Sequence, residues 1–79
     1  MTLVRPKITN QIRRLRFDAA EMTQKDLAEA VGVTRQTIMA IENAKYFPSL
    51  ELAFQIALHF QKPLDQVFQF EPDPKAVLV

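Results

Sequence analysis

The chain contains no cysteine and no tryptophan, and only one glycine and one histidine among its 79 residues. The lack of cysteine excludes disulfide bonds and thiolate metal sites, and it fits a reducing compartment. His59 has no second histidine or serine nucleophile near it in the sequence, so neither a metal site nor a catalytic histidine is expected. A single glycine leaves no glycine-rich loop for a nucleotide phosphate. We therefore expect no enzymatic activity, no metal and no cofactor.

Long apolar runs are also missing. The N-terminal stretch MTLVRPK is too short for a signal peptide, and nothing later approaches the length of a membrane span. A cytoplasmic protein with no membrane partner is therefore expected. The length allows one domain, residues 1–79, and 48% apolar residues with six Phe are typical of a folded globular protein. A core of this size is only marginally stabilising, so a partner surface would help it.

Charge is distributed unevenly, although the net charge is only +1. Residues 1–46 hold eight basic and five acidic side chains, whereas residues 47–79 hold two basic and four acidic ones. A basic half joined to an acidic half orients a molecule on a polyanion.

Residues 24–46, QKDLAEAVGVTRQTIMAIENAKY, fit a helix-turn-helix at nearly every position that geometry constrains. Ala28 is the small residue needed where the first helix backs onto the second, and Gly32 supplies the left-handed backbone of the turn. Ile38 and Ile41, three residues apart, anchor the second helix. The positions of that helix that are left to face outward are Arg35, Gln36, Met39, Ala40 and Asn43.

This outward face favours a helix that reads base edges in a DNA major groove. A solvated helix usually mixes Lys and Glu at i,i+4 spacing, whereas residues 34–40 contain one charge, Arg35. Arg can donate two parallel hydrogen bonds to guanine, and Gln can pair in the same way with adenine. We therefore predict base contacts by the five outward residues, with Arg35 and Gln36 foremost. The alternatives are an ordinary helical hairpin and, for Met39, a place at the edge of the core.

The rest of the chain predicts an all-α bundle of five helices. Four helices are expected to begin at the caps Thr9 or Asn10, Thr23, Thr34 and Ser49 and to end near residues 18, 31, 43 and 60, and a short fifth covers residues 64–67. The alternation in VFQFE predicts a strand over residues 67–71, and we expect it to pair with residues 2–5. Residues 71–79 contain two prolines and are predicted to form an extended tail.

The stretch MTQKDLAEAVGVTRQTIMAIENAKYFPSLELAFQIA resembles the lambda-repressor-like, Cro/CI-type helix-turn-helix domain, also called the xenobiotic-response-element family. The likeness covers roughly residues 8–70 and is strongest to small single-domain repressors that combine VTRQTI, IE and Y-x-PSLELA. It implies the five-helix fold, double-stranded DNA as the partner and base contacts from the third helix. Two departures are Ala44, where the family usually has glycine, and the segment FDAAEM, which is one residue longer than the commonest version.

The resemblance also implies contacts to the DNA backbone. Family members place a Gln at the position of Gln24, where the free N–H groups and positive dipole end of the second helix attract phosphate. The residues expected to contact the backbone beside Gln24 are Thr34, Thr37, Lys45 and Tyr46. For Tyr46, packing against Pro48 is an equally open alternative.

A further backbone contact is implied by an ion pair of the family, in which a first-helix Arg pairs with a Glu and is oriented toward phosphate. Glu42 stands at the position of that Glu, and Arg16 is the best match for the Arg. The extra residue before Thr23 leaves Arg13 and Arg14 as alternatives. A surface pair of little energetic value is the alternative interpretation.

Together these features predict a homodimeric transcriptional repressor that occupies an inverted-repeat operator. We expect no separate effector domain, and no small-molecule effector is evident. Val67, Phe68 and Phe70 exceed what a five-helix core needs, so we predict that they form the dimer interface; alternatively, the rings fold back over the fourth helix of a monomer. Two rival functions are the DNA-binding antitoxin of a toxin–antitoxin pair, with residues 71–79 binding the toxin, and a protein-interaction adaptor on the same fold.

Overall fold

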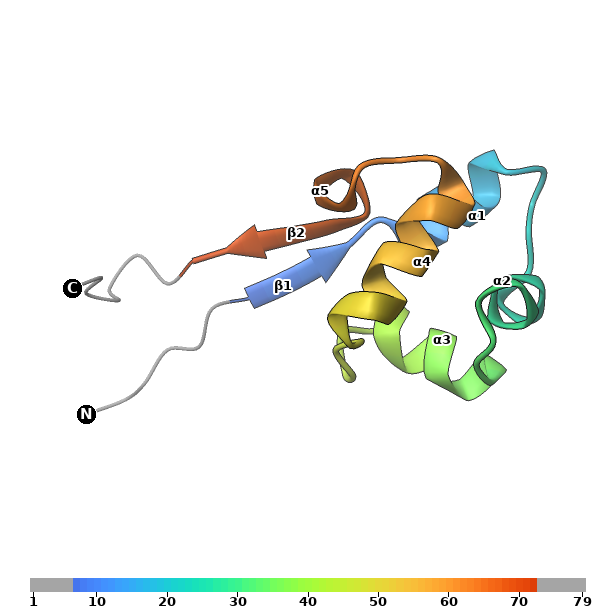
Figure 1. The fold of residues 1–79 in the computed structure, drawn as a ribbon, viewed down its shortest axis with the longest axis horizontal. Coiled ribbons are helices and arrows are strands. Elements are labelled where there is room, and N and C mark those ends of the chain that lie inside the picture. Colours follow the sequence, from blue (N-terminus) through green and yellow to red (C-terminus); the bar gives the residue numbers. More distant parts are fainter. Residues whose placement is uncertain (1–6, 73–79) are drawn as a thin grey trace.

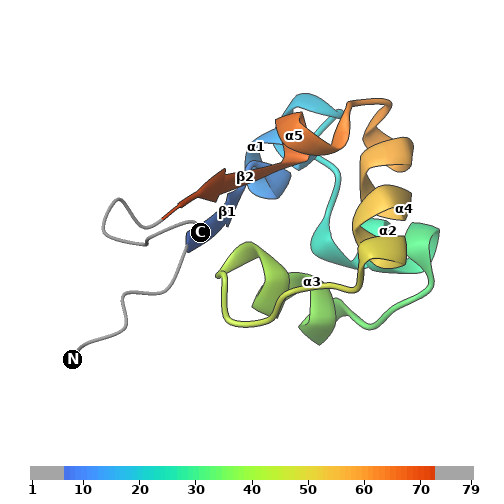
Figure 2. The same ribbon diagram turned by 60° about the vertical axis from the view of Figure 1, so that its left-hand side comes forward.

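The computed structural model describes residues 7–72. In chain order the elements are β1 (Lys7–Asn10), α1 (Ile12–Asp18), α2 (Gln24–Val31), α3 (Arg35–Glu42), α4 (Leu50–Phe60), α5 (Leu64–Val67) and β2 (Phe68–Glu71). The helices form one bundle, and the two strands project from it as an antiparallel pair (Figure 1). Both views place this pair at the end of the molecule away from α2 (Figure 2). The predicted five-helix bundle with a small β-pairing is confirmed.

Side-chain caps begin α2, α3 and α4, as the sequence predicted. The Thr23 hydroxyl accepts a hydrogen bond from the Asp26 N–H at 3.0 Å, and the Asp26 carboxylate accepts one from the Thr23 N–H at 3.2 Å. These two bonds complete a capping box. The hydroxyls of Thr34 and Ser49 each accept from the backbone N–H three residues on. The predicted starts of these helices are therefore confirmed.

Left-handed backbone ends α2 and α3. Gly32 has φ 78° after α2, and Ala44 has φ 57° after α3. The Ala44 N–H donates to the Ile41 carbonyl at 3.0 Å, and the Lys45 N–H donates to the Ala40 carbonyl at 2.9 Å. This pair of bonds is a Schellman motif, in which Ala44 takes the position that glycine usually fills. The strain of alanine at positive φ is on the order of 1 kcal/mol.

The first helix starts later than predicted. Thr9 and Asn10 lie in β1, and α1 begins at Ile12 after Gln11, so the prediction that Thr9 or Asn10 is its N-cap is wrong. The physical reason is the strand pairing, which holds the backbone of residues 7–10 in an extended conformation. The Asn10 side chain still accepts a hydrogen bond from the Ile12 N–H at 3.2 Å.

The two strands pair in antiparallel register, with Lys7 opposite Glu71 and Asn10 opposite Phe68. The strand predicted for residues 67–71 is confirmed except for Val67, which ends α5. Its predicted partner, residues 2–5, lies outside the described residues, and among the described residues the partner is Lys7–Asn10. The predicted tail falls on residues 71–79, of which Glu71 belongs to β2 and 73–79 lie outside the described part.

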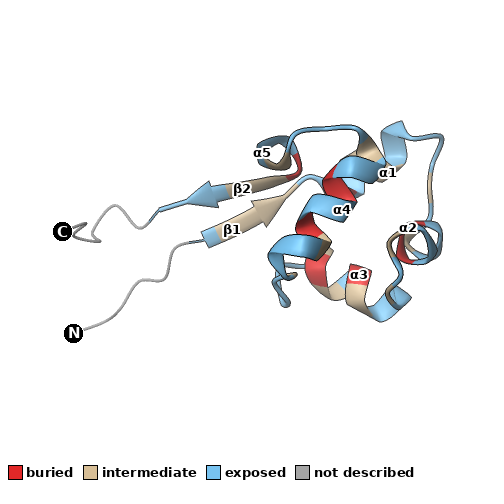
Figure 3. Cartoon of the chain, in the orientation of Figure 1, coloured by how far each residue is buried: buried red, intermediate tan, exposed pale blue. Residues whose placement is uncertain are grey.

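The hydrophobic core lies where the helices meet, and buried segments face inward on α2, α3 and α4 (Figure 3). The buried apolar residues are Ile12, Leu27, Ala28, Ile38, Ile41, Ala53, Ile56, Ala57 and Val67. The predicted anchors of α3, Ile38 and Ile41, are thus confirmed. Val67 has no exposed surface, so its predicted place in a dimer interface is corrected: it is a core residue. Within residues 7–72, none of the helices has the length and apolar character needed to cross a bilayer.

Candidate nucleic-acid interface

The helix-turn-helix predicted within residues 24–46, with helices over residues 24–43, is formed by α2 and α3. α2 ends at Val31, the left-handed Gly32 reverses the chain, and α3 begins at Arg35. The two helices contact each other, and Ala28 of α2 is only 3% exposed, which fits the predicted need for a small residue. This arrangement buries one side of α3 and leaves its other side to solvent.

The first turn of α3 presents Arg35 and Gln36 to solvent. The Thr34 cap fixes where this turn begins, because its hydroxyl accepts the Thr37 N–H at 3.2 Å. Both side chains are therefore exposed at the N-terminal end of a helix whose opposite side is anchored in the core. This is the end of a recognition helix that supplies base contacts in the major groove.

The remaining predicted base-contact residues follow along α3. Met39 is 40% exposed, Ala40 is half-buried, and Asn43, which follows the last helical residue, is exposed. Met39 does not belong to the residues that pack against the core. Its exposure leaves Met39 accessible to a ligand.

Arg16 is the arginine that pairs with Glu42, and not Arg13 or Arg14. Its Nε donates to Oε2 at 2.7 Å, its Nη2 donates to Oε1 at 3.0 Å, and its Nη1 donates to the Met22 carbonyl at 2.8 Å. The side chains of Arg16 and Glu42 are 15% and 6% exposed, so this is a mostly buried, bidentate pair. It joins α1 to the end of α3 and to the loop before α2.

Gln24 completes this network at the start of α2. Its Nε2 donates to Oε1 of Glu42 at 3.3 Å, which ties the first residue of α2 to the last residue of α3. Because Arg16 neutralises the carboxylate, Glu42 does not face a DNA phosphate as a free anion. The second amide hydrogen of Gln24 and the N–H groups of the first turn remain suited to a phosphate oxygen.

The other predicted backbone contacts flank α3. At its start, the hydroxyls of Thr34 and Thr37 are hydrogen-bonded at 2.9 Å, with Thr34 exposed and Thr37 half-buried. Beyond its end, Lys45 and Tyr46 are exposed, and Tyr46 keeps 49% of its surface in solvent. These side chains therefore lie at the two ends of α3.

Sequence reasoning missed the role of Asn10, which it treated only as a possible helix cap. The Asn10 Nδ2 donates to the Ile41 carbonyl at 2.9 Å and to the Glu42 carbonyl at 3.5 Å. These partners are more than thirty residues away in the sequence, so no local pattern reveals them. The strand β1 is thereby linked to the C-terminal end of the recognition helix.

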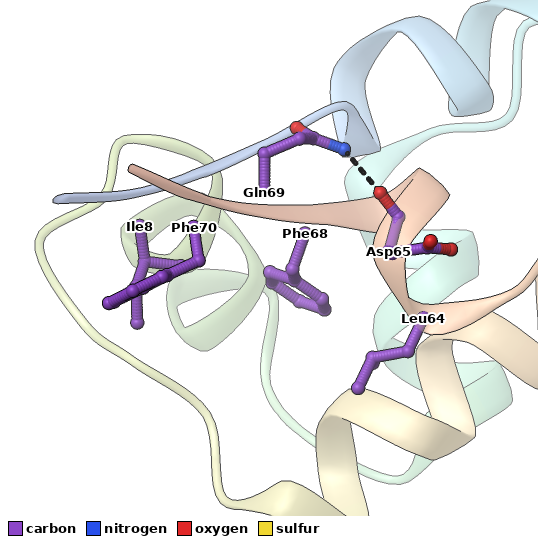
Figure 4. A pocket seen from close by; sticks show the side chains of 6 residues that line it. All are labelled: Ile8, Leu64, Asp65, Phe68, Gln69 and Phe70. Carbon is purple, nitrogen blue, oxygen red and sulfur yellow. Dashed lines mark hydrogen bonds between the residues drawn. The ribbon is translucent and has the colours of Figure 1, made fainter. Parts of the chain in front are cut away.

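A second surface, outside the helix-turn-helix, is apolar. On one face of the two-stranded sheet, Ile8, Phe68 and Phe70 project toward the same side and line an open cavity of about 640 Å³ with Leu64 (Figure 4). Phe47 and Leu50, which are 55% and 66% exposed, line an adjoining cavity. The residues of this apolar surface are Ile8, Phe47, Leu50, Leu64, Phe68 and Phe70.

The sequence predicted only Phe68 and Phe70 of this surface. A signal for more was present in α4, where Leu50, Phe54 and Leu58 stand four residues apart in addition to the core positions. All three are more than half exposed, at 66%, 53% and 77%. Because the core-facing side of α4 is already formed by other residues, this second row of apolar side chains indicates more apolar surface than one bundle buries.

A model of the helix-turn-helix family matches residues 12–67, which is most of the chain. The chain belongs to the Cro/CI-type helix-turn-helix family of transcriptional regulators. The matched segment contains α1 to α5 and leaves both strands outside. Within this family the α2–α3 unit is the DNA-binding element, which agrees with the exposed face of α3.

Several relatives are HTH-type transcriptional regulators. An uncharacterised one from Methanocaldococcus jannaschii is 54% identical over 52 residues, which cover 66% of this chain and 79% of the relative. YgzD from Bacillus subtilis is 42% identical over 64 residues, which cover 81% of this chain and 96% of YgzD. One from Archaeoglobus fulgidus is 46% identical over 52 residues, covering 66% of this chain and 73% of the relative. Similarity of this kind therefore extends to HTH-type transcriptional regulators of both archaea and bacteria.

Proposed function

We propose that this Cro/CI-type regulator binds double-stranded DNA sequence-specifically as a homodimer and represses transcription by occupying an inverted-repeat operator. The observation that carries the proposal is the first turn of α3, where Arg35 and Gln36 are exposed immediately after the Thr34 cap. The N-terminal residues of a recognition helix are the ones that contact base edges in the major groove.

The base-reading residues of the proposal differ in chemistry. The Arg35 guanidinium suits the O6 and N7 acceptors of guanine, and the Gln36 amide suits the N6 and N7 atoms of adenine. Met39 suits a thymine methyl group, while Ala40 and Asn43 stand where bases farther along the groove are reached. The helix carries no free acid on this face, since Glu42 is paired with Arg16. A polyanion can therefore approach it closely.

Phosphate contacts position the protein without reading sequence. In the proposal they come from Gln24 at the start of α2, from Thr34 and Thr37 before α3, and from Lys45 and Tyr46 after it. Arg16 has a different part, because its guanidinium is largely engaged by Glu42 and Met22. It contributes chiefly by holding Glu42, which in turn holds Gln24.

The dimer in the proposal forms through the apolar surface. Phe70 is 61% exposed and Leu50 is 66% exposed, and an exposed apolar cluster of this kind usually marks an association site. A two-fold dimer places two α3 helices on one side of a duplex, about one helical turn or 34 Å apart. The operator is then an inverted repeat whose half-site centres lie about 10 base pairs apart.

Selection of bound duplexes from a random pool, followed by sequencing, tests this function. We expect enrichment of one inverted repeat, together with binding that weakens as salt concentration rises. A pool that shows no enriched sequence after repeated rounds would overturn sequence-specific binding. Copurification of a second protein that binds this chain tightly would favour the antitoxin function. Absence of any salt-sensitive DNA binding would favour the adaptor.

A further inference from the structure

We propose that Asn10 is a positioning residue for DNA recognition, because it ties the strand that carries part of the apolar surface to the C-terminal end of the recognition helix. This inference rests on the proposed function of α3 in DNA binding. It adds a residue outside the helix-turn-helix and outside the segment that matches the family, residues 12–67.

The geometry of Asn10 uses both ends of its side-chain amide. Nδ2 donates to the Ile41 carbonyl at 2.9 Å and, more weakly, to the Glu42 carbonyl at 3.5 Å. Oδ1 accepts from the Ile12 N–H at 3.2 Å, at the start of α1. The side chain is half-buried at the end of β1, so these bonds are partly shielded from water. One amide therefore joins the strand, the first helix and the recognition helix.

The C-terminal end of α3 needs such a partner. The last four carbonyls of a helix have no intrahelical N–H to accept from. The Schellman motif provides donors for two of these carbonyls: the Lys45 N–H for Ala40 and the Ala44 N–H for Ile41. Asn10 adds a second donor to Ile41 and supplies the Glu42 carbonyl. The end of α3 is thus held from within the loop and also from the strand.

The same residue lies next to the apolar surface. In the sheet register Asn10 stands opposite Phe68, which lines the cavity of that surface. At its other end, the Asn10 amide bonds to the carbonyls of Ile41 and Glu42, and the next residue, Asn43, belongs to the proposed DNA interface. A displacement of β1 would therefore be transmitted to the recognition helix directly through the Asn10 hydrogen bonds. Asn10 sets the orientation of α3 relative to the strands.

Asn10→Asp separates the two roles of the amide. The carboxylate keeps an acceptor for the Ile12 N–H, and its negative charge suits the start of α1. It loses both donors and places a charge against the carbonyls of Ile41 and Glu42. We expect the ratio of specific to non-specific DNA affinity to fall about fivefold, the size expected for loss of one or two hydrogen bonds. We also expect the backbone amide resonances of Glu42, Asn43 and Ala44 to shift in the protein without DNA.

Gln69→Ala is the matched control, since Gln69 is the side-chain amide on the other face of the same sheet. Its Nε2 donates to the Asp65 carbonyl at 3.1 Å, and its Oε1 accepts from Gln11 at 3.4 Å, so within residues 7–72 it forms no hydrogen bond with α3 that the variant could remove. We expect this variant to leave both the affinity ratio and the α3 resonances unchanged. Each variant is measured at a temperature where circular dichroism shows it folded, and Asn10→Ser replaces Asn10→Asp if the latter does not fold.

An unchanged affinity ratio in Asn10→Asp, or an equal fall in Gln69→Ala, would overturn the positioning role. Failure of the proposed function is distinguishable, because the unaltered chain would then select no sequence. In that case the backbone amide resonances at the end of α3 still test whether Asn10 positions this helix. Shifts confined to Asn10→Asp support it, and their absence overturns it.

Discussion

The Arg16 guanidinium donates two hydrogen bonds to the Glu42 carboxylate, 2.7 Å from Nε to Oε2 and 3.0 Å from Nη2 to Oε1. Both side chains are mostly buried, at 15% and 6% exposed. Removing one member of such a pair leaves the other as an uncompensated buried charge. The pair therefore holds α1 against α3 strongly even if forming it from solvated charges yields little net stability.

Arg16→Met should lower the free energy of unfolding by about 3 kcal/mol, because Glu42 loses its charge partner. Urea denaturation followed by circular dichroism measures the change. Arg14→Met is the matched control, since Arg14 lies 3.9 Å from Asp18 in an exposed pair with 80% and 61% of the two side chains in solvent. We expect the control to change stability by no more than about 0.5 kcal/mol. Equal losses in both variants would contradict the buried pair.

Ala44→Gly should raise the free energy of unfolding by about 1 kcal/mol, because glycine relieves the left-handed strain at φ 57°. The matched control is Ala30→Gly at an exposed position inside α2, where glycine should lower stability by about 1 kcal/mol. Opposite signs of the two shifts in urea denaturation are the expected result. A loss of stability in both variants would show that Ala44 is not strained.

Asp26 should make the stability of α2 dependent on pH in the acid range. The hydrogen bonds from the Thr23 backbone N–H and then the Thr23 hydroxyl lower the pKa of Asp26 below its usual value of 3.8. Its contribution to stability is therefore complete above the unfolded pKa and is lost as the pH falls through the lower, folded pKa. Asp26→Asn removes this titration, so its melting temperature should fall less than that of the unaltered chain between about pH 5 and pH 2. Parallel melting curves across that range would contradict the capping role, and Glu29→Gln in the same helix is the control.

The parts of the fold that the sequence predicted are those specified by neighbours in the chain. Caps such as Thr23 and Thr34 act on N–H groups three residues away, and Gly32 supplies its own left-handed backbone, so α2 and α3 could be placed from local pattern. The Arg16–Glu42 pair came from the family resemblance, and the structure selected Arg16 from three arginines. Local chemistry thus accounts for most of the recognition unit.

The parts that the sequence did not predict depend on distant partners. The end of β1 could be mistaken for a helix cap because its pairing with Phe68–Glu71 spans about sixty residues of sequence. The prediction of Val67 in the dimer interface is wrong for a related reason: Val67 ends α5 and is buried in the core, while the next residue begins a strand. The bonds of Asn10 to Ile41 and Glu42 likewise cross between elements. Such contacts become visible only when the elements are placed in space.

Arg35→Ala should weaken binding to the selected operator by about 1–3 kcal/mol and relax the preference at one base position, because in the proposed complex the guanidinium bonds to a base edge. Gln24→Ala should weaken binding to operator and unrelated DNA by similar factors, because in the proposed complex Gln24 contacts the DNA backbone and no base. Titrations of both variants against the operator, single-base variants of it and unrelated duplexes measure these effects. Equal, sequence-independent losses for both variants would show that Arg35 contacts phosphate and not a base.

Phe70→Asp should dissociate the proposed dimer. Phe70 is 61% exposed, so the change should leave the bundle folded, whereas Phe68 packs against the core and its replacement would also disturb the fold. An unpaired carboxylate buried in the apolar surface should raise the dimer dissociation constant about a hundredfold, or ~3 kcal/mol. Phe17→Asp makes the same change at a residue that is 67% exposed on α1 and does not line the apolar surface, so it should remain a dimer. Sedimentation at micromolar concentration separates the outcomes. A monomeric unaltered chain, or a Phe70→Asp variant that stays dimeric and binds the operator normally, would rule out this interface.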